Sequence, residues 1–121
     1  ENDTAVRPGL LVYGIAPEGR RRLGSAMIKG LKPALSWKCR VALVKTLSSG
    51  DGVSYGGTYR ARRVMKVAVI TVGYGDGYMR RAGNIAHVLI HGRLCPVIGR
   101  VTMDQTMVDV SDIGNVSPGE E

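Results

Sequence analysis

The sequence predicts a mainly β fold: a small closed or partly open antiparallel barrel, Greek-key-like, with six or seven strands. Two observations support this fold class. Glycine is abundant, at 17 of 121 residues, while phenylalanine is absent. Short runs of valine, isoleucine and leucine recur between glycine-rich turns, which is typical of strands joined by tight turns. No apolar run approaches the ~18 residues of a membrane-spanning helix, so we expect no membrane partner.

The N-terminal part of the chain contains one apolar run and one basic loop. Leu10-Leu-Val-Tyr13 lies between Pro8-Gly9 and Gly14, which predicts a buried strand with turns at both ends. Residues 18–30 carry the triplet Arg20-Arg-Arg22 and are predicted to be a linker between two structural units. From Leu31 onward the pattern is that of β structure.

The first long β pattern covers residues 35–47, where apolar and polar residues alternate over much of the length. Such alternation predicts a strand with one face exposed to solvent. The residues expected on its apolar side are Leu35, Trp37, Cys39, Val41 and Leu43.

Three further β segments follow. Val67–Val72 is almost continuously apolar, which predicts a strand buried on both faces. Residues 88–90 and 94–98 flank His91-Gly92 and predict a hairpin. Residues 99–110 alternate again and predict the last strand.

Charge is distributed unevenly along the chain. Residues 1–66 hold 13 lysines and arginines against 4 aspartates and glutamates, a net +9, whereas residues 67–121 hold 4 against 6, a net −2. The basic half indicates an anionic partner or a solvated basic face. Cys39 and Cys95 lie far apart and outside any CxxC pair, so a single disulfide is possible but two buried thiols in a reduced cytoplasm are favoured.

The stretch Gly50-Asp-Gly-Val-Ser-Tyr-Gly-Gly-Thr-Tyr59 places Tyr55 between glycines. Glycines let the backbone take positive φ and approach a partner closely, so the Tyr55 hydroxyl could reach a ligand. A phenol is a poor base unless positive charge surrounds it. Such charge is available nearby in the sequence, from Lys38, Arg40, Lys45, Arg60, Arg62 and Arg63. The alternative is a hairpin tyrosine packed on the barrel.

Two more loops concentrate aromatic and polar groups, one with Tyr74 and Asp76 and one with Met103 and Asp104. All three loops could meet at one rim of the barrel, where a rigid β framework usually carries its binding residues. Gly73-x-Gly-x-Gly lacks the spacing of a nucleotide-binding loop. His87, His91 and Cys95 are four residues apart, but the turn at His91-Gly92 would separate them, so no metal site is predicted.

The motifs together resemble the alanine racemases, pyridoxal-phosphate enzymes of fold type III, and they cover nearly the whole chain. They are Val6-Arg-Pro-Gly9, Leu11-Val-Tyr-Gly14, Gly52-Val-Ser-Tyr-Gly-x-Thr-Tyr59, Gly73-Tyr-x-Asp-Gly-Tyr78 and Gly99-Arg-Val-x-Met-Asp-Gln105. The resemblance implies that residues 1–17 are the last segment of a (β/α)8 barrel domain, 18–30 a linker, and 31–121 a C-terminal β-barrel domain truncated at its C-terminus. It also implies a cytoplasmic homodimer that interconverts L- and D-alanine for peptidoglycan precursors.

The same resemblance implies a role for individual residues. Tyr55 is similar to a catalytic base delivered to the barrel domain of the other subunit. Met103 is similar to the residue whose amide binds the substrate carboxylate. Arg7 is similar to the partner of the cofactor's pyridine nitrogen, and Gly9 and Leu10 are similar to residues whose backbone amides bind the cofactor phosphate. Tyr74, Arg80 and Arg100 are similar to residues that line the passage through which the substrate enters and binds.

No segment resembles the family's motif for the lysine that anchors pyridoxal 5′-phosphate. We therefore expect this chain alone to be inactive and to hold no covalent cofactor. A stand-alone basic β-barrel that binds nucleic acid or an acidic protein is the alternative, although the resemblance implies no nucleic-acid partner. A related racemase acting on serine or lysine is a third possibility.

Overall fold

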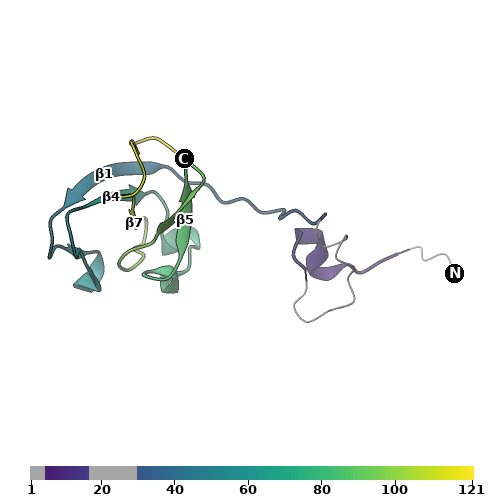
Figure 1. The fold of residues 1–121 in the computed structure, drawn as a ribbon. Helices are drawn as coiled ribbons and strands as arrows, with labels where there is room; N and C mark the ends of the chain where they lie inside the picture. The colour runs from purple at the N-terminus through teal and green to yellow at the C-terminus, as the bar shows by residue number, and fades with distance from the viewer. Residues whose placement is uncertain (1–4, 17–29) are drawn as a thin grey trace. The chain divides into compact units, whose positions relative to one another are not determined.

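The computed structural model describes residues 5–16 and 30–121, and contacts divide the chain into two units, Glu1–Trp37 and Lys38–Glu121 (Figure 1). The predicted linker lies outside the described residues except for Gly30, and so does its arginine triplet. The assignment of residues 1–17 to a barrel domain stays a prediction.

The apolar run of the first unit is a 3-10 helix, η1 (Gly9–Tyr13), and not the predicted buried strand. None of its residues is buried. Gly14 ends it at φ 72°, and its N–H donates to the carbonyls of Leu10 and Leu11. A short apolar run fits a helical turn as well as a strand, and the left-handed glycine at its end decides for the helical turn.

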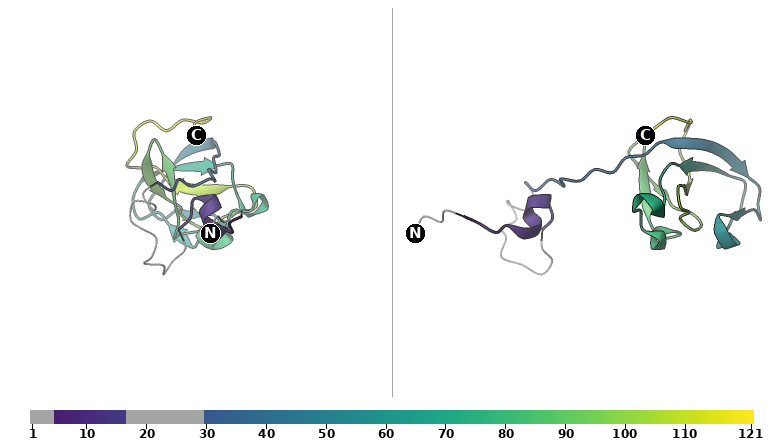
Figure 2. Two further views of the ribbon diagram at one scale, coloured as in Figure 1. Left: turned by 90° about the vertical axis from the view of Figure 1, so that its right-hand side faces the viewer. Right: turned by 180° about the vertical axis from the view of Figure 1, so that it is seen from behind.

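The second unit contains seven strands in three antiparallel sheets, which confirms the mainly β prediction (Figures 1 and 2). The largest sheet has the order β1 (Val41–Leu47), β4 (Met65–Ile70), β7 (Thr106–Asp109). The smaller sheets pair β2 (Gly52–Val53) with β3 (Tyr59–Arg60), and β5 (His87–Ile90) with β6 (Arg93–Pro96). Within the described residues these sheets form no closed ring, so the fold is the partly open form of the prediction.

β1 is shorter than predicted, and its apolar side is only partly the predicted one. A register shift between Val41 and Leu43 marks a bulge, which breaks the alternation of faces. Val41 is therefore buried and Leu43 is half exposed, while Val44 packs against the core instead. Leu35 and Trp37 precede the strand and are exposed.

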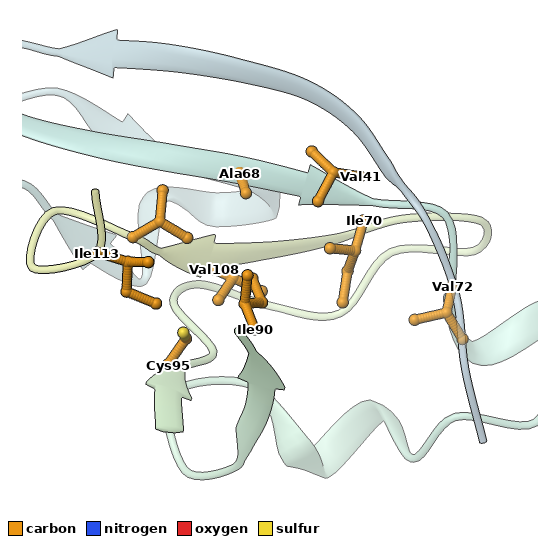
Figure 3. Packing of buried hydrophobic residues seen from close by; sticks show 9 residues of the cluster. Val41, Ala68, Ile70, Val72, Ile90, Cys95, Val108 and Ile113 are labelled. Atoms are coloured by element: carbon orange, nitrogen blue, oxygen red, sulfur yellow. The ribbon is translucent and has the colours of Figure 1, made fainter. Parts of the chain in front are cut away.

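β4 is buried on both faces, as predicted. Met65 and Val67 belong to one hydrophobic cluster, which also contains Leu47, Val53, Ala61 and Ile98. Ala68 and Ile70 belong to a second cluster on the other face, since side chains alternate along a strand. In Figure 3 the side chains of this second cluster point into the space between the large sheet and the β5–β6 hairpin.

The hairpin prediction is confirmed, and the prediction for the last strand is wrong in length. Ile90 pairs with Arg93 across His91-Gly92, whose φ values of 51° and 73° are those of the tight turn that suits twisted strands. β7 covers only the end of residues 99–110. Gly99 is left-handed at φ 72°, and the N–H of Thr102 donates to the Gln105 carbonyl, so residues 99–105 form a loop.

Both cysteines are free; Cys95 is buried as predicted, whereas Cys39 is only partly buried. Cys95 is buried in the cluster of Figure 3, and Cys39 packs against the same cluster. Burial raises the pKa of each thiol above its ordinary value. Among the described residues no helix is long and apolar enough to cross a membrane.

Candidate active site

Three loops of the second unit are joined to one another by hydrogen bonds, and we call them the loop edge: residues 52–58, 73–84 and 99–105. They include the 3-10 turns η2 (Tyr55–Gly57), η3 (Tyr74–Asp76) and η4 (Arg80–Ala82). Figure 1 shows the teal and green turns at the lower margin of this unit, on the side away from the C-terminus, which is marked C. The loops carry five of the eight residues singled out by the family resemblance.

The loops 73–84 and 99–105 are held together through their backbones. The N–H of Tyr74 donates to the Thr102 carbonyl at 2.9 Å, and the N–H of Gly75 donates to the Met103 carbonyl at 2.8 Å. A Cβ atom at Gly73 would lie 2.2 Å from the Met103 carbonyl oxygen, so only glycine permits this approach. Within the described residues the Met103 N–H donates to no acceptor, which leaves it available to a ligand.

The loop that carries Tyr55 is joined to the loop 99–105 at a second point. The Ser54 hydroxyl donates to the Arg100 carbonyl at 2.6 Å. A Cβ atom at Gly99 would lie 2.8 Å from the Val53 carbonyl oxygen, so these backbones are also in close contact. A Cβ atom at Gly56 would lie 3.6 Å from Nη1 of Arg100, which places this guanidinium beside the Tyr55 turn.

Asn84 ties all three loops together. Its Oδ1 accepts from the Gly99 N–H at 2.6 Å, and its Nδ2 donates to Oγ1 of Thr58 at 3.3 Å. The turns containing Tyr55 and Tyr74 are therefore both fixed to the segment that leads to Met103. The expectation that the three loops meet is confirmed.

Large side chains project from the loop edge. Tyr55 is 57% exposed, Met103 52% and Tyr74 37%. The Arg80 guanidinium lies 5.6 Å from the centre of the Tyr74 ring, a distance at which a cation is attracted to an aromatic face. Because Tyr55 is exposed, the alternative of a tyrosine packed on the barrel is wrong.

The basic residues expected around Tyr55 are mostly engaged elsewhere. Arg60 donates to the Gly50 carbonyl and Arg40 to the Gly119 carbonyl. Lys38 pairs with Glu121, and Arg63 pairs with Asp112. A cation that was not among the expected ones lies beside the Tyr55 turn instead: the guanidinium of Arg100, through its approach to Gly56.

The predicted cofactor residues Arg7, Gly9 and Leu10 lie in the first unit, where all three are exposed. Gly9 is left-handed at φ 57°, with no atom within 4 Å of the position a Cβ would take. An exposed guanidinium and open backbone amides suit an anionic ligand such as a phosphate ester. Their role stays a prediction.

Sequence reasoning missed Ser54 and Asn84. Ser54 stands directly before Tyr55 in the motif, and Asn84 follows a glycine in a turn, where asparagine tolerates positive φ. Those are weak signals, because the partners of both side chains lie 15 to 46 residues away along the chain.

The histidine of the predicted hairpin turn has a carboxylate partner: Nε2 of His91 lies 2.9 Å from Oε2 of Glu120. No group of three or more possible metal ligands forms in the part of the chain that the structure describes.

Comparison with known proteins gives a consistent result. The family model for the C-terminal domain of alanine racemase matches residues 34–121. The alanine racemase of Methylacidiphilum infernorum is 47% identical over 116 residues, which are 96% of this chain and 28% of that protein. The alanine racemase of Symbiobacterium thermophilum is 51% identical over 116 residues, again 96% of this chain and 30% of that protein.

Solved structures give the same picture. The biosynthetic alanine racemase of Pseudomonas aeruginosa superposes with a TM-score of 0.82 at 36% identity, covering 93% of this chain and 30% of that one. The alanine racemase of Bacillus anthracis with bound L-Ala-P gives a TM-score of 0.78 at 37% identity, covering 93% and 28%. The chain thus spans less than a third of the length of these proteins.

Proposed function

Because the chain belongs to the alanine racemase family, as its C-terminal domain, we propose that the full-length protein carrying it interconverts L- and D-alanine. The observation that carries the proposal is the loop edge. There the exposed Tyr55 lies on a turn that is hydrogen-bonded to the loop 99–105, and the backbone N–H of Met103 in that loop is available to a ligand. D-Alanine for peptidoglycan precursors is the expected use of the product, and the cytoplasm is the expected compartment.

Tyr55 acts as the base on one face of the substrate. Racemisation requires a proton to leave Cα on one face and another to arrive on the opposite face. The Tyr55 phenolate takes the proton from one enantiomer, and in the reverse direction the phenol returns it. A lysine outside this chain serves the other face. Pyridoxal 5′-phosphate, when bound, supplies the electron sink that acidifies the Cα–H bond.

Arg100 lines the passage by which the substrate reaches Tyr55, since its guanidinium lies beside the Tyr55 turn. The Met103 N–H binds the substrate carboxylate, since a backbone amide is a good donor to an anion. Tyr74 and Arg80 stack on each other and line the passage to the site.

Residues of the first unit contribute to the cofactor site. Arg7 would face the pyridine nitrogen of the bound cofactor, and the amides of Gly9 and Leu10 would bind its phosphate. An arginine at that nitrogen, in place of a carboxylate, would leave the nitrogen unprotonated and so limit electron withdrawal into the ring. Side reactions such as transamination would then be disfavoured, and Arg7→Glu would raise them.

The protein works as a homodimer in which Tyr55 serves the barrel domain of the partner subunit. Support comes from the exposure of Tyr55, Met103 and Tyr74 at one edge of the domain. Large side chains left open to solvent on hydrogen-bonded loops are typical of a surface that another domain covers.

The test is Tyr55→Phe in the full-length protein, with Tyr59→Phe as the matched control. Tyr59 lies on the same hairpin, but its hydroxyl faces the sulfur of Met65 and not the loop edge. We expect Tyr55→Phe to lower kcat/KM for alanine by about 10²–10⁴-fold. The loss must be equal in both directions, because the equilibrium constant of a racemisation is one. Wild-type turnover by Tyr55→Phe would refute the proposal.

Mixed dimers test the exchange between subunits. Subunits with Tyr55→Phe are mixed with subunits that lack the cofactor-anchoring lysine, each inactive alone. Delivery across the interface rebuilds one site in each mixed dimer, so about a quarter of wild-type activity returns after equal mixing. If Tyr55 served its own subunit, no activity would return. Assays with serine and lysine in place of alanine decide between substrates.

The isolated chain provides a second check. We expect it to show no racemase activity, and to form no stoichiometric adduct with pyridoxal phosphate that borohydride fixes to a lysine. A stoichiometric adduct would contradict the assignment of the anchoring lysine to another part of the protein.

A further inference from the structure

Ser54 has a backbone conformation that side chains rarely adopt. Its φ is 59° and its ψ −169°, in a region that is essentially confined to glycine. Such a conformation persists only where the surrounding structure enforces it. Ser54 is also the last residue before Tyr55, between β2 and η2.

The surroundings of Ser54 show what enforces this conformation. On its N-terminal side, Val53 is 4% exposed and anchored in a core cluster. The Ser54 hydroxyl donates to the Arg100 carbonyl at 2.6 Å. A Cβ atom at Gly99 would lie 3.0 Å from the Cβ of Ser54, so the two segments are already in contact. Ser54 is thus fixed between the core and the loop 99–105.

That loop is the one that presents Met103. Two backbone hydrogen bonds fasten it to the Tyr74 turn, so it offers a firm support. The Ser54 bond therefore sets the distance between the Tyr55 turn and the Met103 amide. The second tie, from Asn84 to Thr58, is longer at 3.3 Å and lies beyond Tyr55 in the chain.

We propose that Ser54 is a positioning residue for Tyr55: it holds the phenol oxygen at the place where this oxygen reaches the Cα–H bond of the substrate. This inference rests on the proposed function, in which Tyr55 is a base. As the Cα–H bond breaks, its electron pair stays on the substrate and the proton forms an O–H bond on Tyr55. Ser54 takes no part in that transfer and does not touch the substrate.

The experiment compares Ser54→Ala and Ser54→Gly with Ser49→Ala in the full-length protein. The Ser49 hydroxyl also donates to an arginine carbonyl, that of Arg62 at 3.3 Å, in the same hairpin but away from the loop edge. Glycine accepts the φ of Ser54 without strain, so Ser54→Gly keeps the fold while it removes the hydroxyl. We expect both Ser54 variants to lose about 10- to 100-fold in kcat/KM, because small misplacements of a reacting group have effects of that size. Ser49→Ala keeps wild-type activity.

Isotope effects separate positioning from a general loss of structure. Each enantiomer of alanine is deuterated at Cα and its isotope effect on kcat/KM is measured. In Ser54→Gly the Tyr55 step becomes more rate-limiting, so the isotope effect rises for the enantiomer whose proton Tyr55 removes. For the other enantiomer it falls, because the lysine step then limits the rate less. A smaller fraction of folded enzyme would leave both isotope effects unchanged.

The outcomes are distinct. If Tyr55→Phe is impaired while Ser54→Gly has wild-type kcat/KM, the role of Ser54 is overturned and the proposed function stands. The role is also overturned if Ser54→Gly is slow with both isotope effects unchanged. If Tyr55→Phe keeps wild-type activity, the proposed function fails and this inference fails with it.

Discussion

The core around β4 and the loop edge belong to the same unit but are held by different forces. In the core, Val67, Ala68 and Val108 are fully buried, and their stability comes from apolar area removed from water. At the loop edge the large side chains are exposed. Here backbone and side-chain hydrogen bonds hold the loops together, with glycines where two backbones approach closely.

This difference separates stability from function. Hydrophobic burial has no direction, so a core tolerates rearrangement of similar volume at a modest cost. Hydrogen bonds and close backbone contacts are directional, so they fix the position of a phenol oxygen and an amide relative to each other. Changes in the core should therefore alter the free energy of unfolding, and changes at the loop edge should alter catalysis.

The largest effect on stability is expected from Ile70→Ala. Ile70 is 3% exposed and lies in the cluster of Figure 3, so the change loses transfer free energy and leaves a cavity. We expect a loss of about 2–5 kcal/mol in the free energy of unfolding, measured with denaturant. The matched control is Ile85→Ala, since Ile85 is 75% exposed and should change stability by about 0.5 kcal/mol or less. Equal losses in the two variants would contradict the position of the core.

A change at Gly73 tests the other side of the comparison. In Gly73→Ala the new Cβ would collide with the Met103 carbonyl oxygen, so the loops must separate. We expect kcat/KM of the full-length protein to fall about 100-fold, with a stability loss of about 1–3 kcal/mol. Gly114→Ala is the control, because no atom lies within 4 Å of its Cβ position. Wild-type kcat/KM in Gly73→Ala would show that catalysis does not depend on the close contact between the loops 73–84 and 99–105.

The smallest effect on the free energy of unfolding is expected from alkaline pH, which acts on the two thiols packed in or against the core. Burial raises the pKa of the Cys95 thiol above its ordinary value of 9.0, and burial also raises the pKa of Cys39. The unfolded chain loses these protons first as pH rises. The stabilisation is therefore complete below pH 9.0 and is lost as pH rises through the folded pKa. The denaturant midpoint should therefore fall as pH rises above 9.0, and less steeply in Cys95→Ala; an unchanged slope in that variant would contradict the assignment.

Most of the core could be predicted from the sequence, since burial leaves a pattern in the chain. The apolar run after Lys66 and the turn at His91-Gly92 predict a central strand and a hairpin, and both are present. The failures have local causes. A bulge after Val41 changes the faces of β1, and Gly14 turns the run Gly9–Tyr13 into a helical turn.

The loop edge was predictable only in part. Glycine-flanked motifs and a family resemblance point to Tyr55, Tyr74 and Met103, and the structure brings their loops together. The bonds that join the loops could not be predicted. The Ser54 hydroxyl reaches an acceptor 46 residues away, and its positive φ leaves no trace in hydropathy.

The most direct test is the crystal structure of the full-length dimer with cofactor and an alanine analogue bound. We expect the Tyr55 oxygen to lie about 3–3.5 Å from the reacting carbon, on the face opposite the lysine. We also expect this oxygen to come from the partner subunit and the Met103 N–H to point at the carboxylate. A Tyr55 side chain turned away from the substrate, or a different residue on that face, would contradict it.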